Sequence, residues 1–182
     1  MKNNLKRQML VFDSAYTYEM MVQRNMSELV TSRDLGGFFS HVWSVHPMAS
    51  IVLPASSPLR YGSPEVRKLS SRHTIIEGKI GRYAILAWFP VLNFLFSQLN
   101  LLWYLFRLVK QNRITVVRAE DPYYNGLLGL LVSALMKIPL MIGVWGNPGA
   151  IRKFSNRPLM PRLFKWVWLE EVVERFVLRR AD

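Results

Sequence analysis

The sequence predicts an α/β fold, namely a Rossmann-like, doubly wound and mostly parallel sheet with helices on both faces. Two observations carry this prediction. In the last third of the chain, apolar runs of strand length alternate with helical segments across short connections, which is the rhythm of βαβ units. The chain also has 182 residues, of which 51% are hydrophobic, so it can bury one sizeable core but hardly two. We therefore expect one domain over residues 1–182.

The first 80 residues are expected to supply three strands and one helix. Residues 8–12 form a short apolar run, residues 38–45 carry aromatic and β-branched side chains, and residues 73–77 are a third strand candidate. Between the first two strands, residues 17–32 have a helical pattern. Residues 47–72 are rich in proline, glycine and serine, so we expect them to form a loop.

The most hydrophobic segment is 83–106, in which 24 residues carry no charge, enough to span a bilayer. Polar residues nevertheless recur at intervals of three and four along one helix face, at Asn93, Ser97, Asn100, Tyr104, Arg107 and Gln111. This polar stripe favours a surface helix that buries its apolar face. A membrane span and a re-entrant segment remain as alternatives.

The last third is expected to contain two strands, 114–117 and 140–144, and two helices, 123–137 and 159–180. In an open parallel sheet, ligands bind outside the carboxyl ends of the strands, so the loops that follow the strands are the candidate site. These loops hold a mixture that suits a hydroxyl-rich or phosphate-bearing ligand: Asp13, Ser14, Tyr16, His46, Arg118, Glu120, Asp121, Trp145, Gly146 and Asn147.

Most motifs of catalysis are missing from the sequence. The dinucleotide-binding G-x-G-x-x-G, the P-loop G-x-x-x-x-G-K-[ST] and the hydrolase G-x-S-x-G do not occur. The chain has no cysteine, and its three histidines, His41, His46 and His73, have no spacing of metal ligands. We therefore expect no metal site, no disulfide and no cysteine nucleophile.

Four segments of the last third occur in an order and spacing typical of one enzyme family. They are Val116–Pro122 (VVRAEDP), Gly126–Leu131 (GLLGLL), Lys137–Pro148 (KIPLMIGVWGNP) and Glu174–Asp182 (ERFVLRRAD). In this order they resemble the N-terminal domain of family 4 glycosyltransferases. The resemblance covers about residues 80–182, whereas residues 8–80 match only in the order of their elements.

The resemblance implies one half of a GT-B enzyme, which transfers a sugar from a nucleotide-sugar donor across a cleft between two domains. This chain would be the acceptor-side domain, and the donor-binding domain is expected to be missing, so that the chain alone is expected to be inactive. No cofactor is implied besides the nucleotide sugar as co-substrate. Two departures weaken standard catalysis: Trp145 replaces the family's histidine before Gly146, and residues 13–18 replace a glycine-rich loop.

Each candidate site residue has a structural alternative that the sequence leaves open. Glu120 and Asp121 are the catalytic candidates, because a carboxylate at a strand end can orient or deprotonate an acceptor hydroxyl. Asp121 is also suited to a turn or helix cap before Pro122, and this structural role is the favoured one. Arg118 would clamp a phosphate or sugar, or else pair with a neighbouring carboxylate. Trp145 would stack on the acceptor or pack against the protein, and His46 would serve either the site or its loop.

The charge of the chain points to an anionic membrane surface. Lys and Arg number 24 against 12 Asp and Glu, a net charge of +12. Basic and aromatic residues occur together in two segments, at Arg107, Lys110, Arg113, Arg152, Lys153, Phe154, Arg157, Arg162, Phe164, Lys165, Trp166 and Trp168. Such a mixture is typical of helices that lie on anionic lipid, although a solvated basic face is an alternative. No nucleic-acid reading motif is present, so nucleic acid is not an expected partner.

These observations combine into one expected function and one alternative. We expect a glycosyltransferase domain that binds a glycan or lipid-linked acceptor at the inner face of the cytoplasmic membrane. A cytoplasmic, peripheral location is expected because the apolar run near the N-terminus is too short for a signal peptide. The alternative is a non-catalytic membrane-surface binding domain or an inactive fragment of a glycosyltransferase.

Overall fold

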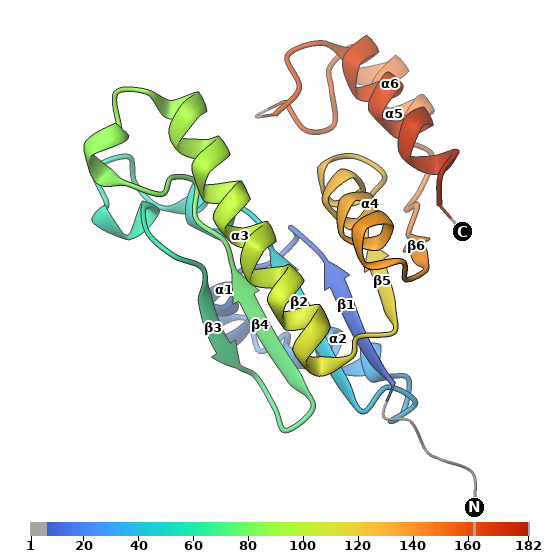
Figure 1. Ribbon diagram of the computed structural model, residues 1–182. Helices are drawn as coiled ribbons and strands as arrows, with labels where there is room; N and C mark the ends of the chain where they lie inside the picture. The colour runs from blue at the N-terminus through green and yellow to red at the C-terminus, as the bar shows by residue number, and fades with distance from the viewer. Residues whose placement is uncertain (1–6, 162, 182) are drawn as a thin grey trace, which may run out of the picture.

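The computed structural model of the chain describes residues 7–161 and 163–181, and it is built on one six-stranded sheet (Figure 1). The strands follow the order β3-β4-β2-β1-β5-β6, and all neighbours are parallel except β3 and β4. Their bounds are β1 Gln8–Phe12, β2 His41–His46, β3 Glu65–Lys68, β4 His73–Glu77, β5 Val116–Ala119 and β6 Leu140–Ile142. The predicted α/β fold class with a mostly parallel sheet is confirmed.

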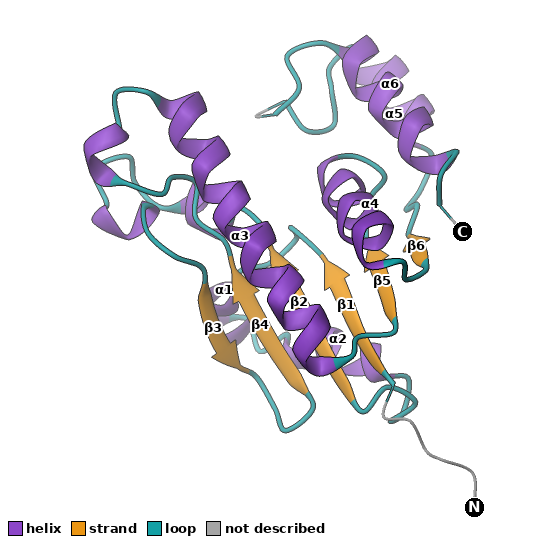
Figure 2. Ribbon diagram, viewed as in Figure 1, coloured by secondary structure: helices purple, strands orange, loops and turns teal. Residues whose placement is uncertain are grey.

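Helices lie on both faces of the sheet (Figure 2). On one face, α3 (Pro90–Asn112) and α4 (Tyr124–Met136) enclose the main core, in which Leu105 and Val132 meet Leu10 and Phe12 of β1. On the other face, α1 (Tyr18–Gln23) and α2 (Ser27–Thr31) contribute Met21 and Val30, which pack with Ile75 of β4. Alternate residues of β1 face opposite sides, so a strand buried on both faces must be apolar throughout.

The order of the strands places a crevice at the centre of the sheet. From β1 the chain builds β2 and β4 on one side, and then crosses through α3 to build β5 and β6 on the other side. Beyond the carboxyl ends of β1 and β5, the connections therefore diverge in opposite directions. This is the topological switch point at which open α/β sheets bind their ligands.

Several predicted elements are confirmed, with shifts at their ends. The strands predicted over 8–12 and 73–77 have those bounds, and the helix predicted over 123–137 is α4. The strand predicted over 38–45 begins only at His41, and the one predicted over 114–117 begins at Val116. The strand predicted over 140–144 ends early, at Ile142.

Two predicted helices are wrong in extent. The segment 17–32 is divided into α1 and α2, because Asn25 has a left-handed φ of 53° that a continuous helix cannot contain, and a 3₁₀ turn, η1 (Ser32–Asp34), follows. The segment 159–180 contains α6 only from Val167 to Leu178. Its first part is a loop after α5 (Pro148–Ser155), and this loop contains two prolines.

The segment 47–72, expected to be a loop, contains short elements. These are the 3₁₀ turns η2 (Ala49–Val52) and η3 (Pro58–Arg60) and the edge strand β3. Strand β3 reads Glu-Val-Arg-Lys and is partly exposed, so its sequence gives only a weak strand signal, and it pairs antiparallel with β4. An antiparallel edge strand on a parallel sheet is common in such folds.

The apolar segment 83–106 forms the 3₁₀ turn η4 (Ala84–Leu86) and most of α3. The expectation that α3 buries its apolar face is wrong for its N-terminal half, where Asn93, Ser97 and Gln98 are buried instead. These side chains bind the backbone of residues 79–83 and of Pro47. Over the described residues 7–161 and 163–181, no helix combines the length and the hydropathy that crossing a membrane would require.

Candidate functional site

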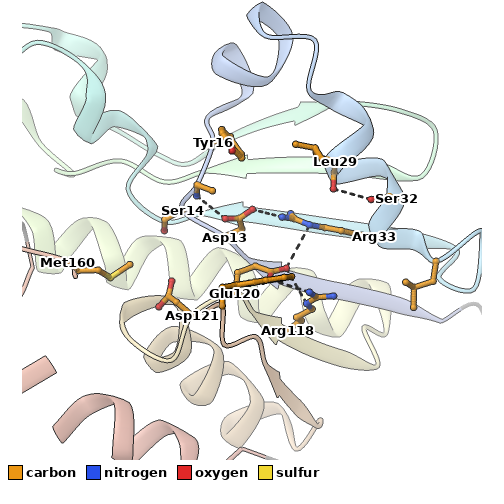
Figure 3. A pocket seen from close by; sticks show the side chains of 13 residues that line it. Asp13, Ser14, Tyr16, Leu29, Ser32, Arg33, Arg118, Glu120, Asp121 and Met160 are labelled. Carbon is orange, nitrogen blue, oxygen red and sulfur yellow. Dashed lines mark hydrogen bonds and ion pairs between the residues drawn. The ribbon is translucent and has the colours of Figure 1, made fainter. Parts of the chain in front are cut away.

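A cavity of about 600 Å³ opens at the switch point, beyond the carboxyl ends of β1 and β5 (Figure 3). Its wall combines the loops after β1 and β5 with η1, the loop after β6 and the loop before α6. Seven predicted site residues line it: Asp13, Ser14, Tyr16, Arg118, Glu120, Asp121 and Trp145. The topology thus brings together residues that lie more than 100 positions apart in the sequence.

Three predicted site residues lie outside the wall of the cavity. His46 ends β2 and is buried, in register with Glu77 of β4. Asn147 is the N-cap of α5, where its Oδ1 accepts a hydrogen bond from the backbone N–H of Ala150 at 3.0 Å. Gly146 has a left-handed φ of 72°, which glycine adopts without strain, and turns the chain toward that helix.

Four charged side chains form a network on the floor of the cavity. Arg33 of η1 pairs with Asp13, and its Nε lies 3.9 Å from Oε1 of Glu120. Arg118 pairs with the same carboxylate, with 3.1 Å between its Nε and Oε1. The network joins two cations to two anions, so it has no net charge. All four side chains are largely buried, and each ion has a partner. The predicted alternative of an ion pair for Arg118 is confirmed.

Trp145 reaches back from the loop after β6 to this network. Its ring Nε1–H donates a hydrogen bond of 3.0 Å to Oε2 of Glu120, while 69% of the residue stays exposed. One edge of the indole is therefore anchored, and much of its surface faces outward. An anchored and exposed ring of this kind is suited to stacking on a ligand.

Asp121 has surroundings different from those of Glu120, because no cation among the described residues 7–161 and 163–181 pairs with it. Its Oδ1 accepts the backbone N–H of Tyr123 at 2.9 Å, and its Oδ2 accepts the side-chain amide of Asn125. The Oδ1 of Asn125 in turn accepts the hydroxyl of Ser14 at 2.9 Å. Burial raises the pKa of Asp121 above its ordinary value, against the opposing effect of these hydrogen bonds. The predicted turn role of Asp121 is confirmed, and the same residue lines the cavity.

Sequence reasoning missed several lining residues, of which Arg33 and Met160 matter most. Arg33 lies in η1, one position beyond the predicted helix 17–32. Met160 lies in the loop between α5 and α6, where Oε2 and Oε1 of Glu170 accept the backbone N–H groups of Leu159 and Met160 at 2.9 and 2.8 Å. Neither residue follows a strand. The expectation that ligands bind outside the carboxyl ends of the strands therefore does not identify them.

The predicted basic surface near α5 and α6 needs correction. Arg152 is buried and is paired with Glu170, at 3.4 Å, and with Glu174. Phe164 is also buried. Lys153, Phe154 and Trp168 are exposed as expected, while Arg162 lies outside the described residues. In the part of the chain that the structure describes, no three His, Asp or Glu side chains come together in a way that could hold a metal ion.

The stability of the fold should depend on pH through His46, the predicted site residue that is buried at the end of β2. Burial lowers the pKa of His46 from its ordinary value of 6.5 to about 4, so the ring is neutral in the folded chain near pH 5. The unfolded chain takes up this proton below about pH 6.5, so stability must fall as the pH falls. We expect a loss of about 2 kcal/mol from this group between pH 7 and pH 5.

The measurement is urea denaturation at pH 7 and pH 5 of the parent chain and of His46→Asn. The pKa values of His41 and His73 are also lowered, chiefly by burial, but both residues stay in the variant and cancel in the comparison. The variant should therefore lose less stability than the parent between the two pH values. Equal losses in the two proteins would contradict a neutral, buried His46.

No protein-family model matches the chain, and no curated protein is significantly similar to it. The resemblance to family 4 glycosyltransferases therefore stays a prediction, which rests on the segments quoted from residues 116–182. The α/β fold is consistent with that prediction and is shared by many unrelated functions.

Proposed function

We propose that the cavity binds the acceptor of a glycosyltransferase, which moves a sugar from a nucleotide-sugar donor to a glycan or lipid-linked acceptor at the cytoplasmic face of a membrane. One observation carries the proposal. Carboxylates, guanidinium groups and an anchored indole converge at the switch point between β1 and β5, where the motif resemblance also places the acceptor side of the family's domain.

These groups have the chemistry that recognises a sugar. Carboxylates and guanidinium groups form strong, charge-assisted hydrogen bonds with neighbouring hydroxyls, and the exposed ring of Trp145 offers an apolar surface to the C–H face of a sugar. Because Asp13 and Glu120 are already held by Arg33 and Arg118, their oxygens are fixed before an acceptor arrives. Such preorganisation lowers the entropy cost of binding.

In the proposed reaction, Asp121 accepts the proton of the acceptor hydroxyl. The hydroxyl oxygen attacks C1 of the donor sugar as the bond from C1 to the diphosphate oxygen breaks. Asp121 suits this role better than Glu120, because a carboxylate with a raised pKa takes a proton more readily than one held by two cations. Glu120 is then the positioning residue for Trp145. The diphosphate would be held by the second domain that the resemblance implies.

A second candidate, a domain that binds sugar without catalysis, is favoured by Trp145. This residue stands where the resembled family has a histidine at its reaction centre, and its ring N–H is hydrogen-bonded to Glu120. An assay of sugar transfer by this chain, mixed with a separately expressed donor domain of that family, discriminates the two. Transfer that Asp121→Asn abolishes supports the enzyme. Acceptor binding without any transfer supports the binding domain.

Acceptor binding itself can be tested with soluble mono- and disaccharides and with a short-chain, lipid-diphosphate-linked disaccharide, by saturation-transfer NMR and titration calorimetry. We expect Trp145→Ala and Glu120→Gln each to weaken binding by about tenfold or more, which corresponds to about 1.4 kcal/mol. Trp168→Ala is the matched control, because Trp168 is also exposed but is not part of the cavity wall. If none of these glycans binds, or if all three variants bind as the parent does, the proposal fails.

A further inference from the structure

The N-terminal half of α3 is oriented opposite to an ordinary surface helix. Asn93, whose exposed fraction is 2%, faces the protein, and its Oδ1 accepts the backbone N–H groups of Arg82 and Tyr83 at 2.6 and 2.9 Å. Ser97 donates a hydrogen bond to the backbone oxygen of Lys79 on the same side. These bonds fix the rotation of the helix, so its apolar side must point outward.

The outward side is a continuous apolar stripe. Within α3, exposed residues follow one another at spacings of three, four and four, which places them on one helix face: Leu92, Leu95, Leu99 and Trp103. Before the helix begins, Ile85 of the turn η4 is 86% exposed, and Trp88 is 90% exposed. We call Ile85, Trp88 and these four helix residues the apolar stripe. Single exposed apolar residues are normal, but a contiguous row marks an interaction surface.

The charges around the apolar stripe indicate what it contacts. From residue 78 to residue 119 the chain has no acidic residue. Two cations lie against aromatic rings at its margin: Arg82 is 5.5 Å from the ring centre of Tyr83, and Arg107 is 4.8 Å from that of Trp103. Beyond Arg107, Lys110 and Arg113 are exposed on the last turn.

An anionic lipid bilayer fits this combination of groups. Interfacial helices insert Leu, Phe and Trp at the boundary between headgroups and acyl chains, and their Lys and Arg contact anionic headgroups. A second copy of the chain fits less well, since a twofold interface over the stripe would bring the same cations against one another. A membrane needs no complementary acidic surface of fixed shape.

We propose that the apolar stripe docks this protein on anionic membranes, with η4 and the first half of α3 inserted into the headgroup region. Helix α3 runs antiparallel to β1, so its inserted end lies toward the carboxyl ends of the parallel strands, as the cavity does (Figure 1). The docked protein would thus hold the cavity near the level of the headgroups, where a lipid-linked sugar begins. The inference rests on the membrane location within the proposed function and names the surface that provides it.

The test is flotation of the full chain with vesicles of phosphatidylcholine alone or with about 30 mol% phosphatidylglycerol, from about 0.05 to 0.5 M salt. We expect binding to the anionic vesicles that weakens with salt. The triple variant Trp88→Ser, Leu95→Gln and Leu99→Gln should bind at least about tenfold more weakly. A control triple, Val22→Gln, Val52→Gln and Leu59→Gln, removes three exposed apolar residues from other elements and should bind as the parent does. Circular dichroism checks that both variants fold.

A second readout uses the absence of cysteine from the chain. An environment-sensitive fluorophore on Leu95→Cys should shift its emission to the blue on addition of anionic vesicles and be quenched by nitroxide lipids. The same label on Leu59→Cys should not respond. Unchanged binding of the stripe variant, or a silent label at position 95, overturns the inference. So does a parent chain that dimerises through the stripe, seen as a monomeric variant in light scattering, without binding vesicles.

The vesicles contain no sugar, so this experiment is independent of acceptor binding. Vesicle binding without glycan binding would leave the docking surface in place and remove the proposed function of the cavity. Glycan binding that requires Trp145, without vesicle binding, would support the acceptor site and remove the docking surface.

Discussion

Asn93→Leu should destabilise the fold by about 3 to 6 kcal/mol, even though it places a good helix former within an apolar helix. The side chain of Asn93 is buried and makes three hydrogen bonds to residues 82 and 83, two as acceptor and one as donor, at 2.6, 2.9 and 2.8 Å. Leucine leaves two backbone N–H groups and one carbonyl oxygen, all partly buried, without these partners. Urea denaturation followed by circular dichroism measures the loss.

Asn100→Leu is the matched control for this prediction. The substitution is the same and the helix is the same, but Asn100 is only partly buried. We expect a change within about 1 kcal/mol. Equally small effects at the two positions would mean that the polar residues of α3 face water throughout. The orientation of the helix, and with it the exposed apolar stripe, would then be wrong.

The different burial of Asn93 and Asn100 shows how far the sequence can predict α3. Spacing alone establishes that the polar residues share one face of a helix. It does not establish whether that face meets water or protein, because the answer depends on the irregular backbone of residues 79–83. Backbone groups that fall outside a helix or a sheet need side-chain partners when they are buried. The packing of such a loop depends on tertiary contacts, which no local sequence pattern predicts.

The same distinction applies to the candidate site. Asp13, Glu120 and Trp145 could be predicted because each follows a strand, and parallel strands must end at one edge of the sheet. The strands themselves were recognisable from buried apolar runs such as residues 8–12. Arg33 could not be predicted in this way, since it reaches the cavity from a 3₁₀ turn that follows α2 and not a strand.

Arg152 of α5 is a buried charge that sequence reasoning placed on the surface. Arg152 was expected in a basic patch, because it is followed by Lys153 and Phe154. The sequence spacing of Arg152 from Glu170 and Glu174 does not indicate an ion pair, because a loop separates the two helices. Glu170 is fully buried, with an exposed fraction of 0%, so a buried cation becomes necessary only once the helices are packed.

Arg152→Met should therefore destabilise the α5–α6 region by about 3 to 5 kcal/mol, because it leaves the carboxylate of Glu170 buried without its cation. Lys153→Met is the control: Lys153 neighbours Arg152 on the same helix but is exposed, and its loss should cost less than about 0.5 kcal/mol. Hydrogen exchange reports the effect locally. The amides of Leu159 and Met160, which donate to Glu170, should lose protection in Arg152→Met and keep it in Lys153→Met.

A double variant separates the pair from the rest of the loop. Glu170→Gln keeps one of the two oxygens that accept from residues 159 and 160 and removes the negative charge, so adding it to Arg152→Met should restore part of the lost stability. Destabilisation that is simply additive in the double variant would contradict the pairing. Restored protection at Met160 should also restore the wall of the cavity, since this residue lines it. Stability of the α5–α6 loop and acceptor affinity should then change together across the series, although Arg152 lies outside the wall of the cavity.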